Sequence, residues 1–190
     1  MNLIYDFETL SQHPENGPIT SIAALVYDPE VEYTYSELLG MAHYMKFNVK
    51  EQVEVYNRII DMETVKWWQA QGEKAQKQIR PSSEDVSITE LPNFFSAVIG
   101  NSKLDKAYTR GNDFDPVFLK TLLSIINSPP PYSWWIIRDT RSMIEGLSCG
   151  SKISSMFIPE ECKDEFVKHD PIHDIAMDVM RMQVLIKAIS

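Results

Sequence analysis

Apolar and polar positions follow two periodicities along this chain, and together they predict a mixture of strands and helices. Short apolar runs rich in β-branched and aromatic residues predict strands at residues 2–7, 19–27, 31–38, 107–109 and 134–137. Residues 41–49 are expected to continue the β region. Apolar residues at helical spacing predict helices at residues 63–71, 73–79, 88–99, 116–127, 140–147 and 171–188. Strands come first and helices alternate with strands later, which indicates an α/β or α+β fold with a mixed sheet.

Capping residues support several of the predicted helix starts. Asp61 and Asp139 stand where N-caps are expected, and Ser87 with Glu90 forms a capping-box pattern. Asp170 followed by Pro171 is a strong start signal, because proline is favoured at the first helical position.

Composition places the chain among ordinary globular proteins. It has 190 residues, of which 44% are hydrophobic and 24% charged, so we expect one domain over residues 1–190. Cys149 and Cys162 lack metal-ligand spacing and are interpreted as structural thiols in a reduced, cytoplasmic setting. We find no secretory signal and no apolar run long enough to span a bilayer, so no membrane partner is expected.

The formal net charge of −9 bears on possible partners. Tight non-specific binding of nucleic acid depends on Lys and Arg at phosphates, so this charge argues against a protein that binds in that way alone. It is compatible with an enzyme that meets phosphate through bound cations, because acidic ligands are neutralised by the ions they hold.

The first predicted strand leads into two carboxylates, Asp6 and Glu8. Alternate residues of a strand share a face, so these side chains project side by side. Adjacent carboxylates repel each other unless a cation lies between them, and hard oxygen ligands suit Mg²⁺ or Mn²⁺. Taken alone, the pair is better explained as a solvated strand end, because D-x-E is common by chance.

Two further acidic stretches stand at predicted helix starts. Asp115 follows a short strand and opens an apolar helix, where the helix dipole favours a carboxylate. A simple N-cap role is the alternative for Asp115, and Asp113 is a competing carboxylate nearby. His169 precedes the last helix and Asp174 lies in its first turns; a histidine there can act as a base near neutral pH. His173 is the competing base candidate.

The ordered set D-x-E at Asp6 and Glu8, N-x-F-D at Asp115, and H-x-x-x-x-D at His169 and Asp174 resembles the DEDDh group of 3′→5′ exonucleases, which have a ribonuclease H-like fold. The chain is most similar to the branch of T4-type phage exonuclease A and the related bacterial 3′→5′ exoribonuclease-like domains. That closer likeness rests on stretches at residues 64–71, 110–115, 138–141 and 169–174, and it covers nearly the whole chain.

The resemblance implies a catalytic site with two divalent cations, Mg²⁺ or Mn²⁺. Asp6, Glu8 and Asp174 would hold one ion, Asp6 would bridge to a second near Asp115, and His169 would accept a proton from the attacking water. The product would be a nucleoside 5′-monophosphate released from a 3′ end, with single-stranded DNA as the expected substrate. A cytoplasmic location is expected. If the protein is encoded by a phage, as some of these relatives are, the expected location is the cytoplasm of the infected host cell.

Substrate-contacting residues are also implied by the resemblance. Thr9, or the backbone beside Phe7 and Glu8, would hold the terminal 3′-hydroxyl, and Phe7 would pack on the terminal nucleotide or in the core. Independently of the resemblance, Arg110 lies next to the Asp115 loop, where it could meet phosphate. Apart from the resemblance, one tryptophan of the adjacent Trp67 and Trp68 is expected in the core. The exposed one has a face on which a base can stack, although packing between elements is the favoured interpretation. We place Trp68 with the substrate contacts, although the sequence leaves the choice open.

Two alternatives remain at this point. The first is a 3′→5′ exoribonuclease, because discrimination depends on how the pocket treats a 2′-hydroxyl. The second is a non-catalytic nucleic-acid-binding module, which would require the loss of a site residue. All five of the expected site residues are present.

Overall fold

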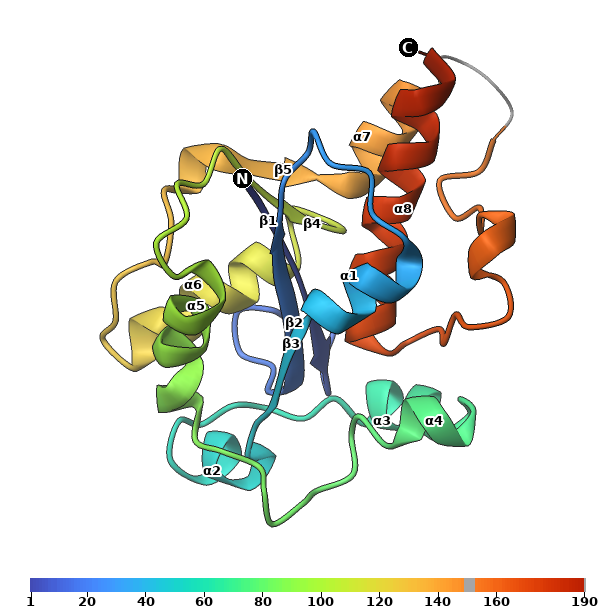
Figure 1. Ribbon diagram of the computed structural model, residues 1–190. Helices are drawn as coiled ribbons and strands as arrows, with labels where there is room; N and C mark the ends of the chain where they lie inside the picture. The colour runs from blue at the N-terminus through green and yellow to red at the C-terminus, as the bar shows by residue number, and fades with distance from the viewer. Residues whose placement is uncertain (149–152, 190) are drawn as a thin grey trace.

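The computed structural model describes residues 1–148 and 153–189, which form a mixed sheet with helices on both faces (Figure 1). The strands are β1 (Asn2–Thr9), β2 (Ile19–Tyr27), β3 (His43–Lys46), β4 (Lys106–Thr109) and β5 (Ile137–Asp139), in the spatial order β3-β2-β1-β4-β5. β2 runs antiparallel to β1 and β3, whereas β4 runs parallel to β1 and β5. β1 is therefore the central strand, hydrogen-bonded on both sides. The predicted α/β class is confirmed.

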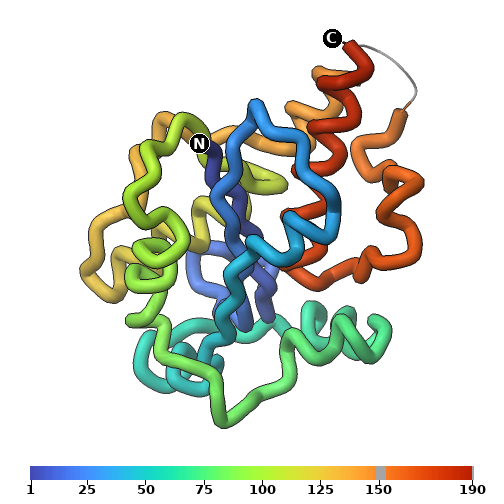
Figure 2. The backbone as a smooth tube through the Cα atoms, in the orientation of Figure 1, coloured from blue at the N-terminus to red at the C-terminus, as the bar shows by residue number. Residues whose placement is uncertain are grey.

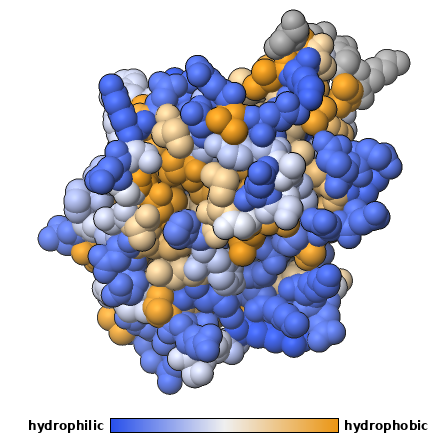
Figure 3. Space-filling model, viewed as in Figure 1, coloured by the Kyte–Doolittle hydropathy of each residue, from blue (hydrophilic) through white to orange (hydrophobic). Residues whose placement is uncertain are grey.

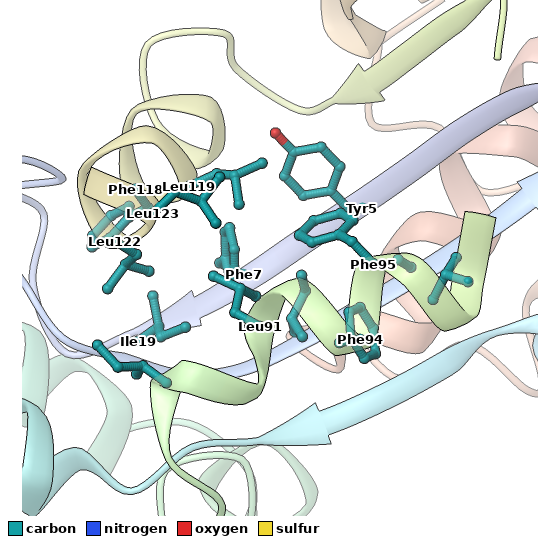
Figure 4. Close-up of a cluster of buried hydrophobic side chains, with 14 of the residues drawn as sticks. Tyr5, Phe7, Ile19, Leu91, Phe94, Phe95, Phe118, Leu119, Leu122 and Leu123 are labelled. Atoms are coloured by element: carbon teal, nitrogen blue, oxygen red, sulfur yellow. The ribbon is translucent and has the colours of Figure 1, made fainter. Parts of the chain in front are cut away.

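One face of the sheet packs against α5 (Leu91–Ile99) and α6 (Asp115–Ile125). Figure 4 shows Tyr5 and Phe7 of β1 pointing into this layer, toward Phe95 of α5 and the leucines of α6. The rings of Tyr5 and Phe95 meet edge to face with centroids 5.5 Å apart. Burial of such side chains stabilises the fold by about 1.5–3 kcal/mol each. This layer therefore fixes the position of β1.

The other face packs against α8 (Pro171–Ile189), with α1 (Tyr35–Met41) and α7 (Thr140–Leu147) beside it. Ile4 of β1 and Ile175 of α8 are both buried in this second core, as is the free thiol of Cys162. α8 begins at Pro171 as predicted. The carboxylate of Asp170 accepts a hydrogen bond from the Ile172 N–H at 3.1 Å. Cys149 lies outside the described residues.

Three short helices lie beyond the C-terminal end of β1, in the lower part of Figures 1 and 2. They are α2 (Val49–Glu54), α3 (Met62–Gln69) and α4 (Glu73–Gln76). Leu10, Trp68 and Ala75 form a small separate core that holds α3 and α4 against the end of β1. Figure 3 shows hydrophilic residues over the outside of α3 and α4. Three 3₁₀ turns complete the description, at Ile88–Glu90, Trp134–Ile136 and Glu160–Cys162.

The strand predicted at residues 31–38 is wrong. Thr34 and Glu37 form a capping box: the Thr34 hydroxyl accepts from the Glu37 N–H, and the Glu37 carboxylate accepts from the Thr34 N–H at 2.8 Å. This local signal starts α1 despite the alternating pattern of the surrounding residues. The predicted β region at 41–49 shrinks to β3, and an Asn48 cap starts α2 directly after it.

The strand predicted at residues 134–137 is largely wrong as well. Trp134–Ile136 form a 3₁₀ turn, and Trp135 is 89% exposed. Pairing with β4 begins only at Ile137, opposite Ala107, so the apolar run is not itself the strand. Within the described residues, every helix is too short or too polar to cross a membrane.

Candidate active site

Two carboxylates project from the end of β1 on the side that faces α8. Asp6 and Glu8 continue the row begun by Ile4, because side chains of a strand alternate between its two faces. α8 packs on this face and brings Asp174 of its first turn to the same place. Carboxylate oxygens of Asp6, Glu8 and Asp174 lie within 4.8 Å of one another. The fold thus gathers three of the predicted ligands at one point.

Asp115 reaches the cluster from the opposite layer. It is the first residue of α6, it is only 2% exposed, and its Oδ1 accepts a hydrogen bond from the Phe7 N–H at 3.0 Å. Phe7 lies between Asp6 and Glu8 in the strand, so this bond ties Asp115 to the backbone of the acidic segment. The competing residue Asp113 is exposed in the preceding loop.

Burial and, after it, repulsion between neighbouring carboxylates raise the pKa values of the acidic residues at this site. Burial raises the pKa of Asp115 to about 7, against the lowering effect of its hydrogen bond from Phe7. Burial, and then the charge of Asp178, raises the pKa of Asp174 to about 7. The pKa values of Asp6 and Glu8 are also raised well above their usual range, by burial first and by neighbouring carboxylates second.

The Arg181 charge lowers the pKa of Asp174, but burial and the neighbouring carboxylates outweigh it. A divalent cation supplies a further counter-charge, and carboxylate oxygens are the ligands that Mg²⁺ and Mn²⁺ prefer. The spacing of the Asp6, Glu8 and Asp174 oxygens lets all three reach a common ion. The residues present therefore fit a divalent metal site.

His169 lies beside this cluster on the loop that enters α8. Its backbone has a φ of 61°, in the left-handed region, and its N–H donates to Asp174 Oδ2 at 3.1 Å. The imidazole packs edge to face on Trp67, with ring centroids 4.8 Å apart. Burial, with a smaller effect from the Lys168 charge, lowers the pKa of His169. A neutral imidazole that can accept a proton is therefore favoured near pH 7.

His173 points to a different neighbour. Its Nδ1 is hydrogen-bonded to the hydroxyl of Tyr35 in α1 at 2.9 Å. The two rings also pack together, with centroids 6.0 Å apart. Among the lining residues of the cavity that contains Asp6 and Asp174, His169 is present and His173 is not.

The side chains expected to contact substrate are placed less simply. Trp68 is 2% exposed and donates its indole N–H to the Thr9 carbonyl at 2.9 Å, whereas Trp67 is 45% exposed. Trp67 therefore offers the larger exposed surface to a base, although Trp68 also lines the cavity beside Glu8. The placement of Trp68 among the substrate contacts stays a prediction. The Thr9 hydroxyl donates to the Ser11 carbonyl at 2.8 Å, and the Phe7 ring lies in the α5–α6 core.

Arg110 is held by an ion pair that the sequence did not predict. Its Nη1 donates to Asp178 Oδ1 at 2.7 Å, and Arg181 donates to the same oxygen at 2.7 Å. Thr140 also donates to Asp178. Asp178 is buried, and it lies four residues after Asp174 on the same helix face, a spacing that could have identified it. Arg110 is therefore committed to this network instead of facing open solvent.

Two cavities flank the carboxylates. The smaller, of about 190 Å³, is lined by Glu8 and Thr9 of β1 and by the exposed ring of Trp67. The larger, of about 350 Å³, is lined by Asp6, Asp174 and the segment before α8. We call them the Glu8-side pocket and the Asp6-side pocket.

The family model for 3′-5′ exoribonuclease Rv2179c-like domains matches residues 1–186. The chain belongs to this family. It is also 30% identical over 205 residues to an exodeoxyribonuclease of enterobacteria phage T4, covering 98% of this chain and 89% of the phage protein. The recognition made from the sequence is thereby confirmed, as is the assignment of the chain to 3′→5′ exonucleases.

Solved structures of exonuclease I share the fold. The E. coli enzyme in complex with a dT13 oligonucleotide gives a TM-score of 0.61 at 15% identity, over 100% of this chain and 40% of that one. A zinc-bound E. coli complex with single-stranded DNA gives a TM-score of 0.58 at 15% identity, over 98% of this chain and 39% of that one. This chain thus spans about 40% of the length of those proteins.

Proposed function

We propose that residues 1–190 form a single 3′→5′ exonuclease domain that releases nucleoside 5′-monophosphates from the 3′ ends of single-stranded DNA. The observation that carries this proposal is the convergence of Asp6, Glu8 and Asp174 within 4.8 Å, with Asp115 bonded to the strand between the first two. Charges so placed are suited to binding cations at a phosphodiester.

Two divalent cations, Mg²⁺ or Mn²⁺, are proposed as cofactors. Asp6, Glu8 and Asp174 would hold one of them, and Asp6 would share the second with the region of Asp115. When bound, such a pair activates a water and stabilises the leaving oxygen of an in-line displacement. The hydrogen bonds from the Phe7 and His169 N–H groups orient the Asp115 and Asp174 carboxylates for this task.

His169 is proposed as the general base. A ring nitrogen of its imidazole would accept the proton of the attacking water, and the packing against Trp67 would hold the ring near the carboxylates. His169→Ala should lower kcat by about 10²- to 10⁴-fold, the usual range for losing a general base. His173→Ala serves as the matched control and should retain most of the activity. The reverse result would assign the base to His173.

The Glu8-side pocket is proposed to hold the terminal nucleotide. Glu8 and Thr9, which line it, would face the 3′-hydroxyl, and the exposed ring of Trp67 would stack on the base. Base stacking on an aromatic side chain contributes about 1–3 kcal/mol, so Trp67→Ala should weaken binding of all four bases. The buried Trp68 would act by fixing the Thr9 backbone.

DNA is proposed as the substrate because the phage relative is an exodeoxyribonuclease. The family description favours RNA as the second candidate. Digestion of end-labelled single-stranded DNA and RNA of matched sequence, with Mg²⁺ or Mn²⁺ and with EDTA as control, tests both. Faster release of deoxynucleoside 5′-monophosphates supports DNA, and faster release of ribonucleotides supports the alternative. Cleavage of neither in either metal would refute the proposed function.

A further inference from the structure

One buried carboxylate outside the acidic cluster joins three elements of the fold. Asp178 is 2% exposed, and its Oδ1 accepts hydrogen bonds from Arg110 Nη1 at 2.7 Å and from Arg181 Nη1 at 2.7 Å. Its Oδ2 accepts a hydrogen bond from the Thr140 hydroxyl. Arg110 directly follows β4, Thr140 opens α7, and Asp178 belongs to α8. The network therefore fixes α8 against both neighbours, one turn after Asp174.

The same two arginines hold the irregular segment that comes before α8. Arg110 Nη2 donates to the Ser155 carbonyl at 3.0 Å, and Arg181 Nε donates to the Phe157 carbonyl at 2.7 Å. Neighbouring residues of this segment line the Asp6-side pocket. One wall of that pocket is therefore attached to α8 through Asp178.

Asp178 is placed to position Asp174 and not to bind a cation itself. Both of its carboxylate oxygens already accept hydrogen bonds. Among the residues that the structure describes, the acidic group able to share one ion consists of Asp6, Glu8 and Asp174. Asp174 and Asp178 lie four residues apart, so they project from the same side of α8. The rotation and depth of the helix at Asp178 therefore set where the Asp174 carboxylate stands relative to β1.

Position is a stronger reason than charge for a link between this network and the acidic cluster. After the effect of burial, the Asp178 charge raises the pKa of Asp174 and the Arg181 charge lowers it, so these two contributions oppose each other. Geometry is more demanding, because Mg²⁺ requires its oxygen ligands at about 2.0–2.1 Å in a near-octahedral arrangement. A small shift of α8 would move the Asp174 carboxylate out of that range.

We propose that Asp178 is a positioning residue: its contacts hold α8 so that the Asp174 carboxylate meets the cation bound at the end of β1. This inference rests on the proposed function and extends it to a residue that touches neither the cation nor the DNA. Loss of the Asp178 contacts should therefore weaken cation binding and leave binding of the DNA strand nearly unchanged.

Binding of Mn²⁺ in the absence of DNA, followed by the EPR signal of the free ion, tests the proposal without relying on activity. Asp178→Asn should raise the dissociation constant of Mn²⁺ by at least about tenfold, within the range of about 10- to 100-fold for groups that orient metal ligands. Thr140→Val removes one hydrogen bond to Asp178 and changes no charge, so the expected rise is about threefold, below that range.

Cleavage of an oligo(dT) strand gives a second measurement. In both variants the Mn²⁺ concentration for half-maximal activity should rise by the same factor as the dissociation constant. KM for the strand at saturating Mn²⁺ should change by less than about twofold, because ground-state binding of DNA is not affected. If Asp178→Asn fails to fold, because two guanidinium groups lose their carboxylate, the milder Thr140→Val decides the outcome.

Two substitutions outside the network are matched controls. Thr121→Val removes a hydroxyl of α6 that donates to the Pro14 carbonyl at 3.0 Å. Leu185→Ala removes a buried side chain near the end of α8. Both should lower the melting temperature, and neither should change the dissociation constant of Mn²⁺.

The contrary outcomes are distinct. An unchanged Mn²⁺ dissociation constant in Asp178→Asn and Thr140→Val would overturn the proposal. A loss confined to Asp178→Asn would assign the effect to charge, and an equal loss in Leu185→Ala would assign it to general destabilisation, so either result would also overturn it. A wild-type protein that binds Mn²⁺ but releases no mononucleotide would count against the proposed function alone. A wild-type protein that binds no Mn²⁺ would contradict both.

Discussion

The two faces of β1 differ in chemistry although they belong to the same eight-residue strand. Toward α5 and α6 the strand presents Tyr5 and Phe7, which are buried among aromatic and aliphatic side chains. Toward α8 it presents Ile4 and then Asp6 and Glu8, whose pKa values are raised by burial first and then by the charges of neighbouring carboxylates, among them Asp115 and Asp174. One strand thus has an anchoring face and a functional face, separated by the alternation of its side chains.

This difference shows how the fold accommodates an unfavourable cluster. Burial of ionised carboxylates without partners costs free energy, and such groups take up protons instead if nothing compensates. Despite this cost, the strand stays in place, because its apolar side chains are packed and its backbone is hydrogen-bonded to β2 and β4. The strand should therefore separate into residues that control activity and residues that control stability.

The largest effect is expected from Asp6→Asn. Asp6 is the proposed bridge between the two cations, so its loss should lower kcat by about a thousandfold or more, because several kcal/mol of charge stabilisation disappears. The fold should persist, since the substitution removes repulsion from a buried site. Mononucleotide release and thermal melting in EDTA measure the two effects.

Asp113→Asn is the matched control for that experiment. Asp113 is an exposed carboxylate in the loop before α6, and its removal changes the net charge by the same amount. Activity within about twofold of the wild type is expected, in line with the usual small effect of surface substitutions. A large loss for Asp113→Asn together with a small loss for Asp6→Asn would contradict the division between the two faces.

The second effect concerns the anchoring face. Phe7→Ala should lower the free energy of unfolding by about 3–5 kcal/mol, as expected when a buried phenylalanine leaves a cavity. Glu8→Gln, the next residue in the strand, should leave that free energy unchanged or raise it. Urea denaturation in EDTA compares the two variants. Equal destabilisation of both would show that the acidic face also holds the strand.

The position of the acidic face of β1 could be predicted because its signals are local, whereas the resemblance of the ordered motifs, and not the local pattern, points to a function for that face. The D-x-E alternation placed Asp6 and Glu8 on one side of β1, and Asp170 with Pro171 correctly started α8, which brings Asp174 to the site. Asp139 caps α7 as predicted, through the Ser142 N–H at 2.6 Å. Each of these features depends on residues within one turn or strand of one another.

What the sequence could not predict depends on contacts between distant segments. Arg110 meets Asp178 across 68 positions, and Trp68 meets the Thr9 carbonyl across 59. The choice of Trp67 over Trp68 as the exposed ring follows from the docking of α3 against the end of β1, which no local pattern encodes. The strand wrongly expected at residues 31–38 shows the converse, since there the Thr34–Glu37 capping box outweighs the alternation.

The smallest expected effect is a pH-dependent shift in stability that sharpens the comparison without any substitution. The pKa values of Asp115 and Asp174 are raised from 3.8 to about 7, so the folded state retains protons that the unfolded state has released. Their favourable contribution is complete below pH 3.8 and is lost as the pH rises through about 7. In EDTA, the wild-type melting temperature should therefore be higher at pH 6 than at pH 8. For a chain of this size, each kcal/mol of change in the free energy of unfolding shifts the melting temperature by about 2–4 °C.

Addition of Mg²⁺ or Mn²⁺ should raise the melting temperature at pH 8 more than at pH 6, because a cation binds the ionised cluster of the folded state. Asp6→Asn should reduce both the pH dependence in EDTA and the response to the metal, whereas a substitution on the other face of β1, such as Phe7→Leu, should lower the melting temperature and leave both dependences in place. The functional face is thus expected to determine how stability responds to protons and cations, and the anchoring face how much stability there is. A metal response that survives Asp6→Asn unchanged would separate cation binding from this face of β1.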